Sequence, residues 1–130
     1  MKLKRRVLLV EDDGDMRAAL AEILEDAGYQ VLQAVNGQDA LEKLRSSDLP
    51  SVILLDLLMP VMNGWQFCEA WRSGQQATSA HVPIVAMSAA ASKDPSSPYY
   101  IDVDDFIAKP IQPDVLLNKI ETLISGTDIG

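Results

Sequence analysis

Residues 52–64 decide the fold, and they read Val-Ile-Leu-Leu-Asp-Leu-Leu-Met-Pro-Val-Met-Asn-Gly. The first four residues form an unbroken apolar run, which is typical of a strand inside a parallel sheet. The run ends at the charged residue Asp56, and helical spacing follows from Trp65 to Arg72. This stretch therefore predicts a buried strand, a carboxylate at its carboxyl end, and a helix after it.

The same alternation continues on both sides of this stretch. Further strands are expected at Val7–Val10, Gln30–Val35, Ile84–Met87 and Asp105–Ala108. Further helices are expected at 15–27, at Asp39–Leu44 and from Pro113 onward. Alternating strands and helices are typical of an α/β domain built around a parallel sheet. The second strand is less hydrophobic than the others, so we expect it at an edge of the sheet.

The stretch between the fourth and fifth strands breaks this alternation. Residues 92–100 read SKDPSSPYY, and the prolines Pro95 and Pro98 oppose a regular helix there. The sequence therefore predicts an irregular or shortened fourth helix, with a short turn of helix around 99–103 as one form. Two interpretations are open: a flexible loop that remodels this surface and carries both tyrosines, or a shortened helix without functional consequence.

Length and charge exclude several classes of protein. The chain has 130 residues, so we expect one domain over 1–130, with its core at about 5–124 and no effector domain. The 19 acidic and 11 basic residues give a net charge of −8, which argues against binding to nucleic acid or to an anionic membrane surface. The apolar run after the basic start is too short for a signal peptide or a membrane span, so we expect a cytoplasmic protein.

Four residues with reactive or aromatic side chains are expected to have structural roles. Cys68 is the only cysteine, which excludes an internal disulfide and a cysteine-rich zinc site, and we expect it to be a buried filler. His81 has no partner motif and is expected to be a loop residue. Trp65 and Trp71 are expected to pack against the core.

Polar residues follow the predicted strands at their carboxyl ends, where open α/β sheets bind their ligands. Residues 11–13 are all acidic and follow the first strand, while Asp56, Ser88 and Lys109 end three others. If the first and third strands are neighbours, their carboxylates repel one another unless a cation compensates. Mg²⁺ binds carboxylate and phosphate oxygens, and a lysine and a hydroxyl suit a phosphoryl group. The combination indicates a site for a metal-bridged phosphoryl group, although the three acids alone also fit a solvated loop.

Four motifs stand in a fixed order along the chain. They are Val10-Glu11-Asp12-Asp13, Asp56-Leu57-Leu58-Met59-Pro60-Val61-Met62-Asn63-Gly64, Met87-Ser88-Ala89 and Asp104-Asp105-Phe106-Ile107-Ala108-Lys109-Pro110. With them the chain resembles the response-regulator receiver domains of two-component signalling, and in particular the chemotaxis-type single-domain receivers. The resemblance covers about residues 5–124. It implies a flavodoxin-like, doubly wound, five-stranded parallel sheet in the order 2-1-3-4-5.

The resemblance also implies roles for the residues around the acceptor. Asp56 would attack the phosphorus of a phosphohistidine and become an aspartyl phosphate. Asp12 and Asp56 would bind Mg²⁺, Glu11 would act on it through water, and the backbone carbonyl of Leu58 would be a further ligand. Lys109 would contact a phosphoryl oxygen, and would pair with Asp56 when the site is empty.

The other motif residues would form a switch. Ser88 would hydrogen-bond the phosphoryl group after a small shift of its loop, and Phe106 stands at the aromatic switch position. Ala89 is small and leaves room for the phosphoryl group, and the bond before Pro110 resembles the family's cis peptide. Leu58 is apolar, and we hypothesise that it shields the acyl phosphate from water.

We therefore predict a Mg²⁺-dependent receiver that takes a phosphoryl group onto Asp56 from a sensor histidine kinase or a histidine phosphotransfer domain. It would act as a switch on a downstream protein, with a phosphorylation-dependent dimer as one form, and would catalyse only its own phosphorylation and dephosphorylation. The alternative is a degenerate receiver that binds partners without phosphorylation. Residues 13–16 lack the hydroxyl that a haloacid-dehalogenase-like phosphatase needs, and the oxygen ligands of a calcium loop do not continue past them.

Overall fold

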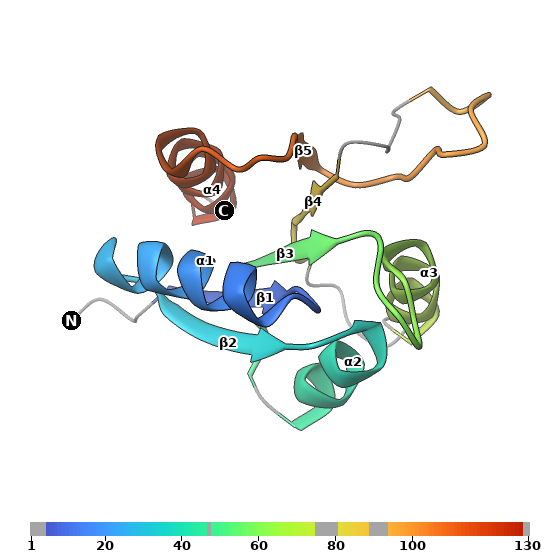
Figure 1. The fold of residues 1–130 in the computed structure, drawn as a ribbon, viewed down its shortest axis with the longest axis horizontal. Coiled ribbons are helices and arrows are strands. Elements are labelled where there is room, and N and C mark those ends of the chain that lie inside the picture. Colours follow the sequence, from blue (N-terminus) through green and yellow to red (C-terminus); the bar gives the residue numbers. More distant parts are fainter. Residues whose placement is uncertain (1–4, 47, 75–80, 89–93, 129–130) are drawn as a thin grey trace.

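Five short apolar strands form one parallel sheet in the order β2-β1-β3-β4-β5 (Figure 1). The computed structural model describes residues 5–46, 48–74, 81–88 and 94–128. The strands are β1 (Arg6–Val10), β2 (Gln30–Ala34), β3 (Val52–Asp56), β4 (Ile84–Met87) and β5 (Asp105–Ile107). The predicted flavodoxin-like order is confirmed, and the less hydrophobic second strand lies at an edge as expected.

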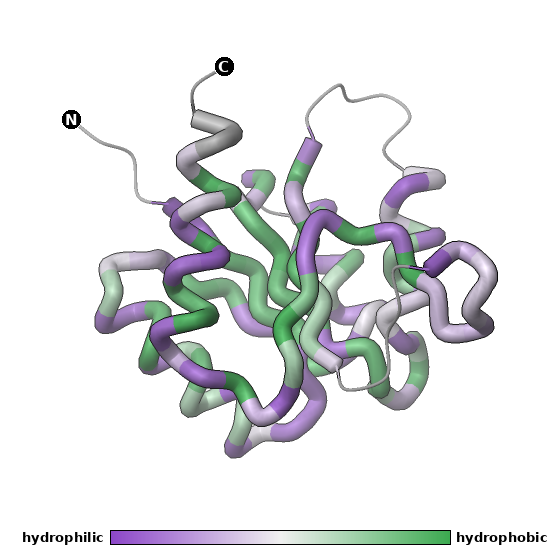
Figure 2. The backbone as a smooth tube through the Cα atoms, turned by 90° about the horizontal axis from the view of Figure 1, so that it is seen from above, coloured by the Kyte–Doolittle hydropathy of each residue, from purple (hydrophilic) through white to green (hydrophobic). Residues whose placement is uncertain are grey.

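Helices cover both faces of the sheet. They are α1 (Gly14–Asp26), α2 (Gly37–Ser46), α3 (Gly64–Gly74) and α4 (Pro113–Asp128). The apolar sides of α1 and α4 pack on one face, and those of α2 and α3 pack on the other. The middle strands are buried from both sides, which explains their unbroken apolar runs. In Figure 2 these strands form the hydrophobic centre of the molecule.

Side-chain caps fix where three of the helices begin. The Oδ1 atom of Asp13 accepts hydrogen bonds from the first turn of α1. Asn36 Oδ1 accepts the Asp39 backbone N–H at 2.8 Å, so α2 begins at Gly37, earlier than predicted from its apolar residues alone. Before α3, Asn63 and Gln66 each accept the backbone N–H of the other at 2.9 Å, which is a capping box. Two of these caps directly follow the loops after β1 and β3.

The described residues between β4 and β5 contain no helix. Residues 94–104 form turns and then extended chain, so the predicted irregularity is confirmed, and the structure does not take the form with a helical turn around 99–103. This stretch still contributes to the core through Ile101, which is buried in the same apolar cluster as Ile84 and Ala86. Residues 89–93 lie outside the described part, and the flexibility of this stretch stays a prediction.

The extended chain at 100–103 is attached to α3. The Trp65 indole N–H donates to the backbone carbonyl of Tyr100 at 3.0 Å, and the Arg72 guanidinium donates to the backbone carbonyl of Asp102. The side chain of Tyr100, like that of its neighbour Tyr99, is exposed. Where the structure describes this connection, at 94–104, the surface next to β4 and β5 is therefore formed by a loop that is bonded to α3.

The expected structural roles of the four distinctive side chains are confirmed. Cys68 is buried, and burial raises the pKa of its thiol to about 11. Trp65 and Trp71 are half-buried against the core on the α3 side. His81 is exposed in the loop before β4, with its Nε2 atom 2.9 Å from Asp104 Oδ2.

We predict that Gly64→Ala destabilises the domain by about 1–3 kcal/mol, because its new methyl group would overpack a tight contact. A Cβ atom at Gly64 would lie 2.8 Å from the Cα atom of Leu57, which is backbone and cannot turn away. Gly74 ends the same helix, and a Cβ atom there meets nothing within 4 Å, so Gly74→Ala is the control. Urea unfolding measures both, and equal free energies of unfolding would contradict the prediction.

Candidate functional site

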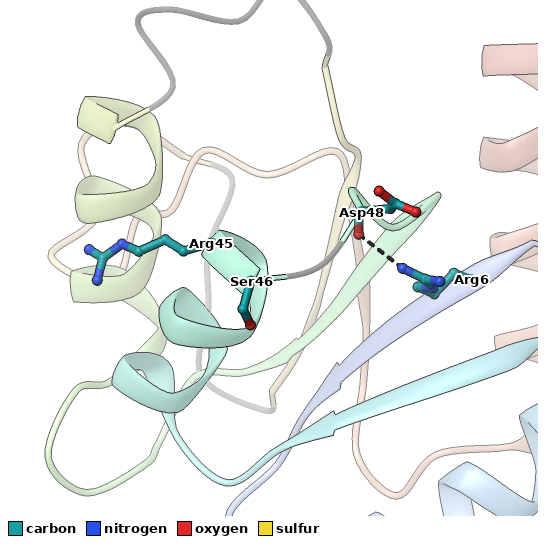
Figure 3. Close-up of a pocket in the computed structure, with 4 residues that line it drawn as sticks. All are labelled: Arg6, Arg45, Ser46 and Asp48. Carbon is teal, nitrogen blue, oxygen red and sulfur yellow. Dashed lines mark hydrogen bonds between the residues drawn. The ribbon is translucent and has the colours of Figure 1, made fainter.

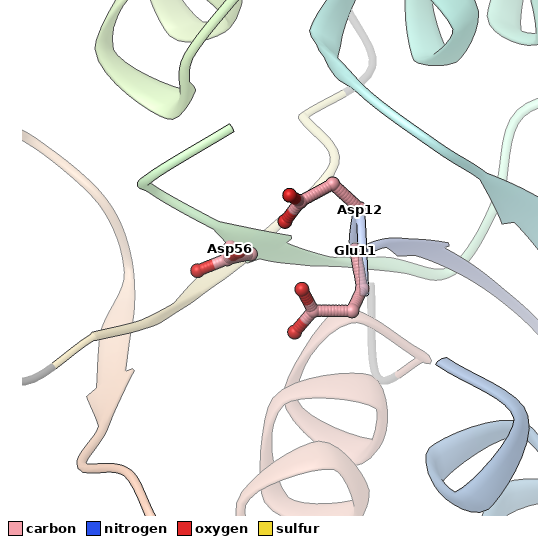
Figure 4. Close-up of side chains that lie close together, drawn as sticks. All are labelled: Glu11, Asp12 and Asp56. Carbon is pink, nitrogen blue, oxygen red and sulfur yellow. The ribbon is translucent and has the colours of Figure 1, made fainter. Parts of the chain in front are cut away.

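Three carboxylates meet at the carboxyl edge of the sheet. The parallel register pairs Val10 of β1 with Leu55 of β3, so the residues that follow them, Glu11 and Asp56, leave adjacent strands side by side. Asp12 follows in the same turn, and one carboxylate oxygen from each of the three residues lies within 4.8 Å of the others. Figure 4 shows all three carboxylates directed into one space.

Burial makes this cluster unusual for charged groups. Glu11 is 1% exposed and Asp56 is 4% exposed, and within the described part of the chain they are the only buried charged residues. Asp12 is exposed. Buried carboxylates need a compensating partner, because removing charge from water is costly.

Lys109 supplies that partner from the loop after β5. Its Nζ atom lies 3.1 Å from Asp56 Oδ1 and 3.2 Å from Glu11 Oε1, so one ammonium group bridges both buried carboxylates. The expected pair with Asp56 is therefore present. The second contact, with Glu11, was not predicted, because spacing along the sequence does not show which carboxylate of a pair a lysine reaches.

One lysine does not balance three carboxylates. Burial raises the pKa of Glu11 to about 7, and its hydrogen bond with Asp56 and the negative charge of Asp56 act in the same direction. Burial alone lowers the pKa of Lys109, but its contacts with Asp56 and Glu11 outweigh this and raise the pKa above its ordinary value. Without a ligand the site thus favours an extra positive charge. Carboxylate oxygens this close together fit a hard divalent cation such as Mg²⁺.

Hydrogen bonds from the first residues of α1 fix the acidic turn after β1. Asp13 lies outside the carboxylate cluster, because its Oδ1 atom accepts the N–H groups of Asp15 and Met16 at 3.0 and 3.2 Å. The Nη1 atom of Arg17 donates to the backbone carbonyl of Glu11 at 2.9 Å. The role of Arg17 was not predicted from the sequence, although its position four residues after the cap Asp13 places it over the first turn of α1.

Comparison with known proteins decides the family. The family described as "Response regulator receiver domain" matches residues 7–121 of the chain. The chain belongs to the response regulator receiver domain family. Receiver domains of this family act in two-component signalling, where they interact with histidine kinases or phosphotransfer proteins.

Individual relatives support the same assignment to the receiver family. The chain is 31% identical over 126 residues to a probable transcriptional regulator, ycf27, of Pyropia yezoensis, covering 96% of this chain and 49% of the relative. It is 34% identical to the receiver domain of a Syntrophus aciditrophicus signal transduction histidine kinase (TM-score 0.77, covering 94% and 91%). A CheY-like receiver of Methanospirillum hungatei is 28% identical (TM-score 0.81, covering 98% and 100%). The chain thus spans about half the length of the first curated relatives it matches.

The two expected switch residues of this receiver lie in or directly after β4 and β5, on the β3 side of the sheet. Ser88 directly follows β4 and is half-buried, and its backbone N–H donates to the carbonyl of Ile107 at 3.2 Å. Phe106 is a half-buried residue of β5 that packs against the core on the α3 side. Both residues therefore lie at or near the edge where the carboxylates meet.

The remaining predicted site residues of the receiver differ in their surroundings. Leu58 is 66% exposed in the loop after β3, so its side chain is not needed in the core. The peptide bond between Lys109 and Pro110 is cis, as the resemblance implied. Ala89 lies outside the described residues.

Of the helices that the structure describes, none has the length and apolar character to cross a membrane.

We predict that Lys109→Met lowers the free energy of unfolding of the metal-free receiver by about 1–3 kcal/mol, because it leaves two buried carboxylates without their shared cation. The matched control is Lys43→Met, which removes an ion pair with Asp39 on the surface of α2. Surface pairs contribute about 0–1 kcal/mol. Chemical denaturation in a chelating buffer measures both, and a smaller effect at Lys109 than at Lys43 would contradict the prediction.

Proposed function

We propose that this receiver accepts a phosphoryl group on Asp56 from a phosphohistidine of a histidine kinase or a phosphotransfer protein, in a Mg²⁺-dependent reaction. The observation that carries the proposal is the environment of Asp56. Its carboxylate contacts Lys109 at 3.1 Å and lies within 4.8 Å of two further carboxylates, at the edge of the sheet where such folds bind ligands. A carboxylate in that setting is placed to be a nucleophile and not only a structural charge.

The chemistry needs little covalent machinery from the protein. An oxygen of the Asp56 carboxylate attacks the phosphorus, the bond from phosphorus to the imidazole nitrogen breaks, and the electron pair stays on the imidazole. Lys109 lies where its ammonium group can contact an oxygen of the transferred phosphoryl group. A bound Mg²⁺, held by Asp12 and Asp56 with Glu11 beside them, would neutralise charge on the phosphoryl group. Position and charge are thus the main contributions of these residues.

The result of this reaction would be a change of state and not the turnover of a separate substrate. Ser88 would hydrogen-bond the phosphoryl group, and the loops that hold Ser88 and Phe106 would form the two-state element. The change would act on a downstream protein through the surface next to β4 and β5, with a phosphorylation-dependent dimer as one form. Such a switch would work in the cytoplasm, where histidine kinases present their phosphohistidine.

We predict that incubation with acetyl phosphate or phosphoramidate and Mg²⁺ adds the mass of one phosphoryl group to the protein, and that Asp56→Asn abolishes the adduct. Intact-protein mass spectrometry measures this. The control is Asp48→Asn, because Asp48 is an exposed aspartate that precedes β3, whereas Asp56 ends it. Absence of an adduct from the wild-type protein with both donors would contradict the proposal. That result would favour a receiver that binds partners without phosphorylation.

We predict that Leu58→Asn shortens the lifetime of the phosphorylated form severalfold. The reason is that an amide two residues after Asp56 can hydrogen-bond a water molecule near the acyl phosphate, whereas leucine excludes water. The control is Val61→Asn, because Val61 is a 74% exposed apolar residue of the same loop and its φ of 69° is one that asparagine tolerates. Decay of the adduct is followed by mass spectrometry after removal of the donor. An unchanged decay rate in Leu58→Asn would contradict the shielding role of Leu58.

A further inference from the structure

Arg17 contacts the acidic turn at two points. Its guanidinium Nη1 atom donates to the backbone carbonyl of Glu11 at 2.9 Å, and its backbone N–H donates to the carbonyl of Asp13 at 2.9 Å. These two carbonyls lie on either side of Asp12. Arg17 therefore binds the backbone on both sides of Asp12, whose carboxylate belongs to the cluster.

The Glu11 carbonyl that Arg17 contacts lies directly after the end of β1. The register between β1 and β2 ends with the pair Val10 and Ala34, and the Glu11 N–H still donates to the Ala34 carbonyl at 3.1 Å. Arg17 donates to the carbonyl of Glu11, the first residue beyond the paired part of β1. Glu11 is thus held through both of its backbone groups, and these bonds set the direction in which its side chain and the next residue leave the strand.

Arg17 also acts electrostatically on a charged residue of α2. Burial alone would raise the pKa of Asp39, but the Val35 N–H, Lys43 and the positive charge of Arg17 together lower it. The Asp39 carboxylate is itself fixed by the Val35 N–H at 2.9 Å and by Lys43 at 3.0 Å. The positive charge of Arg17 is thus close enough to Asp39 to favour its ionised form.

We propose that Arg17 is a positioning residue for the cation site: it holds the turn of Glu11 and Asp12 so that their carboxylates face Asp56. This inference rests on the proposed function, since it concerns the same site. Mg²⁺ requires near-ideal octahedral geometry, so small displacements of a ligand weaken its binding. Groups that orient metal ligands change metal affinity by about 10–100-fold when they are removed.

The charge of Arg17 gives the proposal a sharp test, because the charge and the positioning role have opposite effects on the affinity for Mg²⁺. A positive charge beside a cation site repels the cation, so loss of Arg17 through charge alone would strengthen Mg²⁺ binding. Loss of positioning would weaken it. The sign of the change in affinity therefore separates the two roles.

The experiment is isothermal titration of the purified protein with Mg²⁺, with no phosphodonor present. We expect Arg17→Gln to raise the Kd for Mg²⁺ about tenfold. Glutamine has a helix propensity close to that of arginine, so α1 is preserved. The control is Arg45→Gln, which removes the same charge from the exposed end of α2, where Figure 3 shows Arg45 directed away from Arg6 and Asp48.

A Kd for Arg17→Gln that is unchanged or lower than that of the wild-type protein would overturn the proposal. Lower unfolding stability with an unchanged Kd would show a structural role only, and would also overturn it. If Arg17→Gln does not fold, Arg17→Met replaces it: methionine keeps a high helix propensity but donates no hydrogen bond to the Glu11 carbonyl, so a wild-type Kd in that variant contradicts the proposal. Phosphorylation plays no part in this readout, so its outcome is separate from failure of Asp56 to accept a phosphoryl group.

Discussion

Two buried carboxylates that share one lysine are the constraint around which this receiver is built. Glu11 and Asp56 are both buried, and the ammonium group of Lys109, which comes from a loop far along the chain, contacts both carboxylates. The sheet order β2-β1-β3-β4-β5 places β1 beside β3 and thereby brings the two carboxylates together. The apolar layers on both faces hold those strands rigid. The site is therefore a consequence of the fold, and its excess negative charge is what makes it receptive to a cation.

The local structure around the site is fixed where the chemistry needs it. The caps of α1 and α3 lie directly after the two loops that carry the carboxylates, so these loops end in hydrogen-bonded helix starts. Away from the site the fold departs further from a regular β/α alternation. Between β4 and β5 the described chain is strapped to α3 by Trp65 and Arg72 in place of a helix. The carboxylate cluster and the loop at 94–104 are thus formed by separate parts of the chain.

Much of this architecture was predictable from the sequence, because apolar runs and helical spacing report burial directly. The strands were placed to within a residue, and Asp56, Glu11 and Asp12 were expected at one edge of the sheet. Three features were not predicted. The early start of α2 depends on the cap at Asn36, the bridge from Lys109 to Glu11 depends on side-chain direction, and the contact of Arg17 joins a side chain to a backbone carbonyl. None of these leaves a periodic signal in the sequence.

The most direct test of this charge balance is the free energy of unfolding of the wild-type protein, measured with and without Mg²⁺. A ligand that binds only the folded state raises that free energy by an amount set by its concentration relative to Kd, reaching about 2.7 kcal/mol at a hundredfold excess over Kd. We expect Mg²⁺ to stabilise the receiver, and Asp12→Asn combined with Asp56→Asn to remove the stabilisation. If Mg²⁺ leaves the free energy of unfolding of the wild-type protein unchanged, the carboxylate cluster is not a cation site.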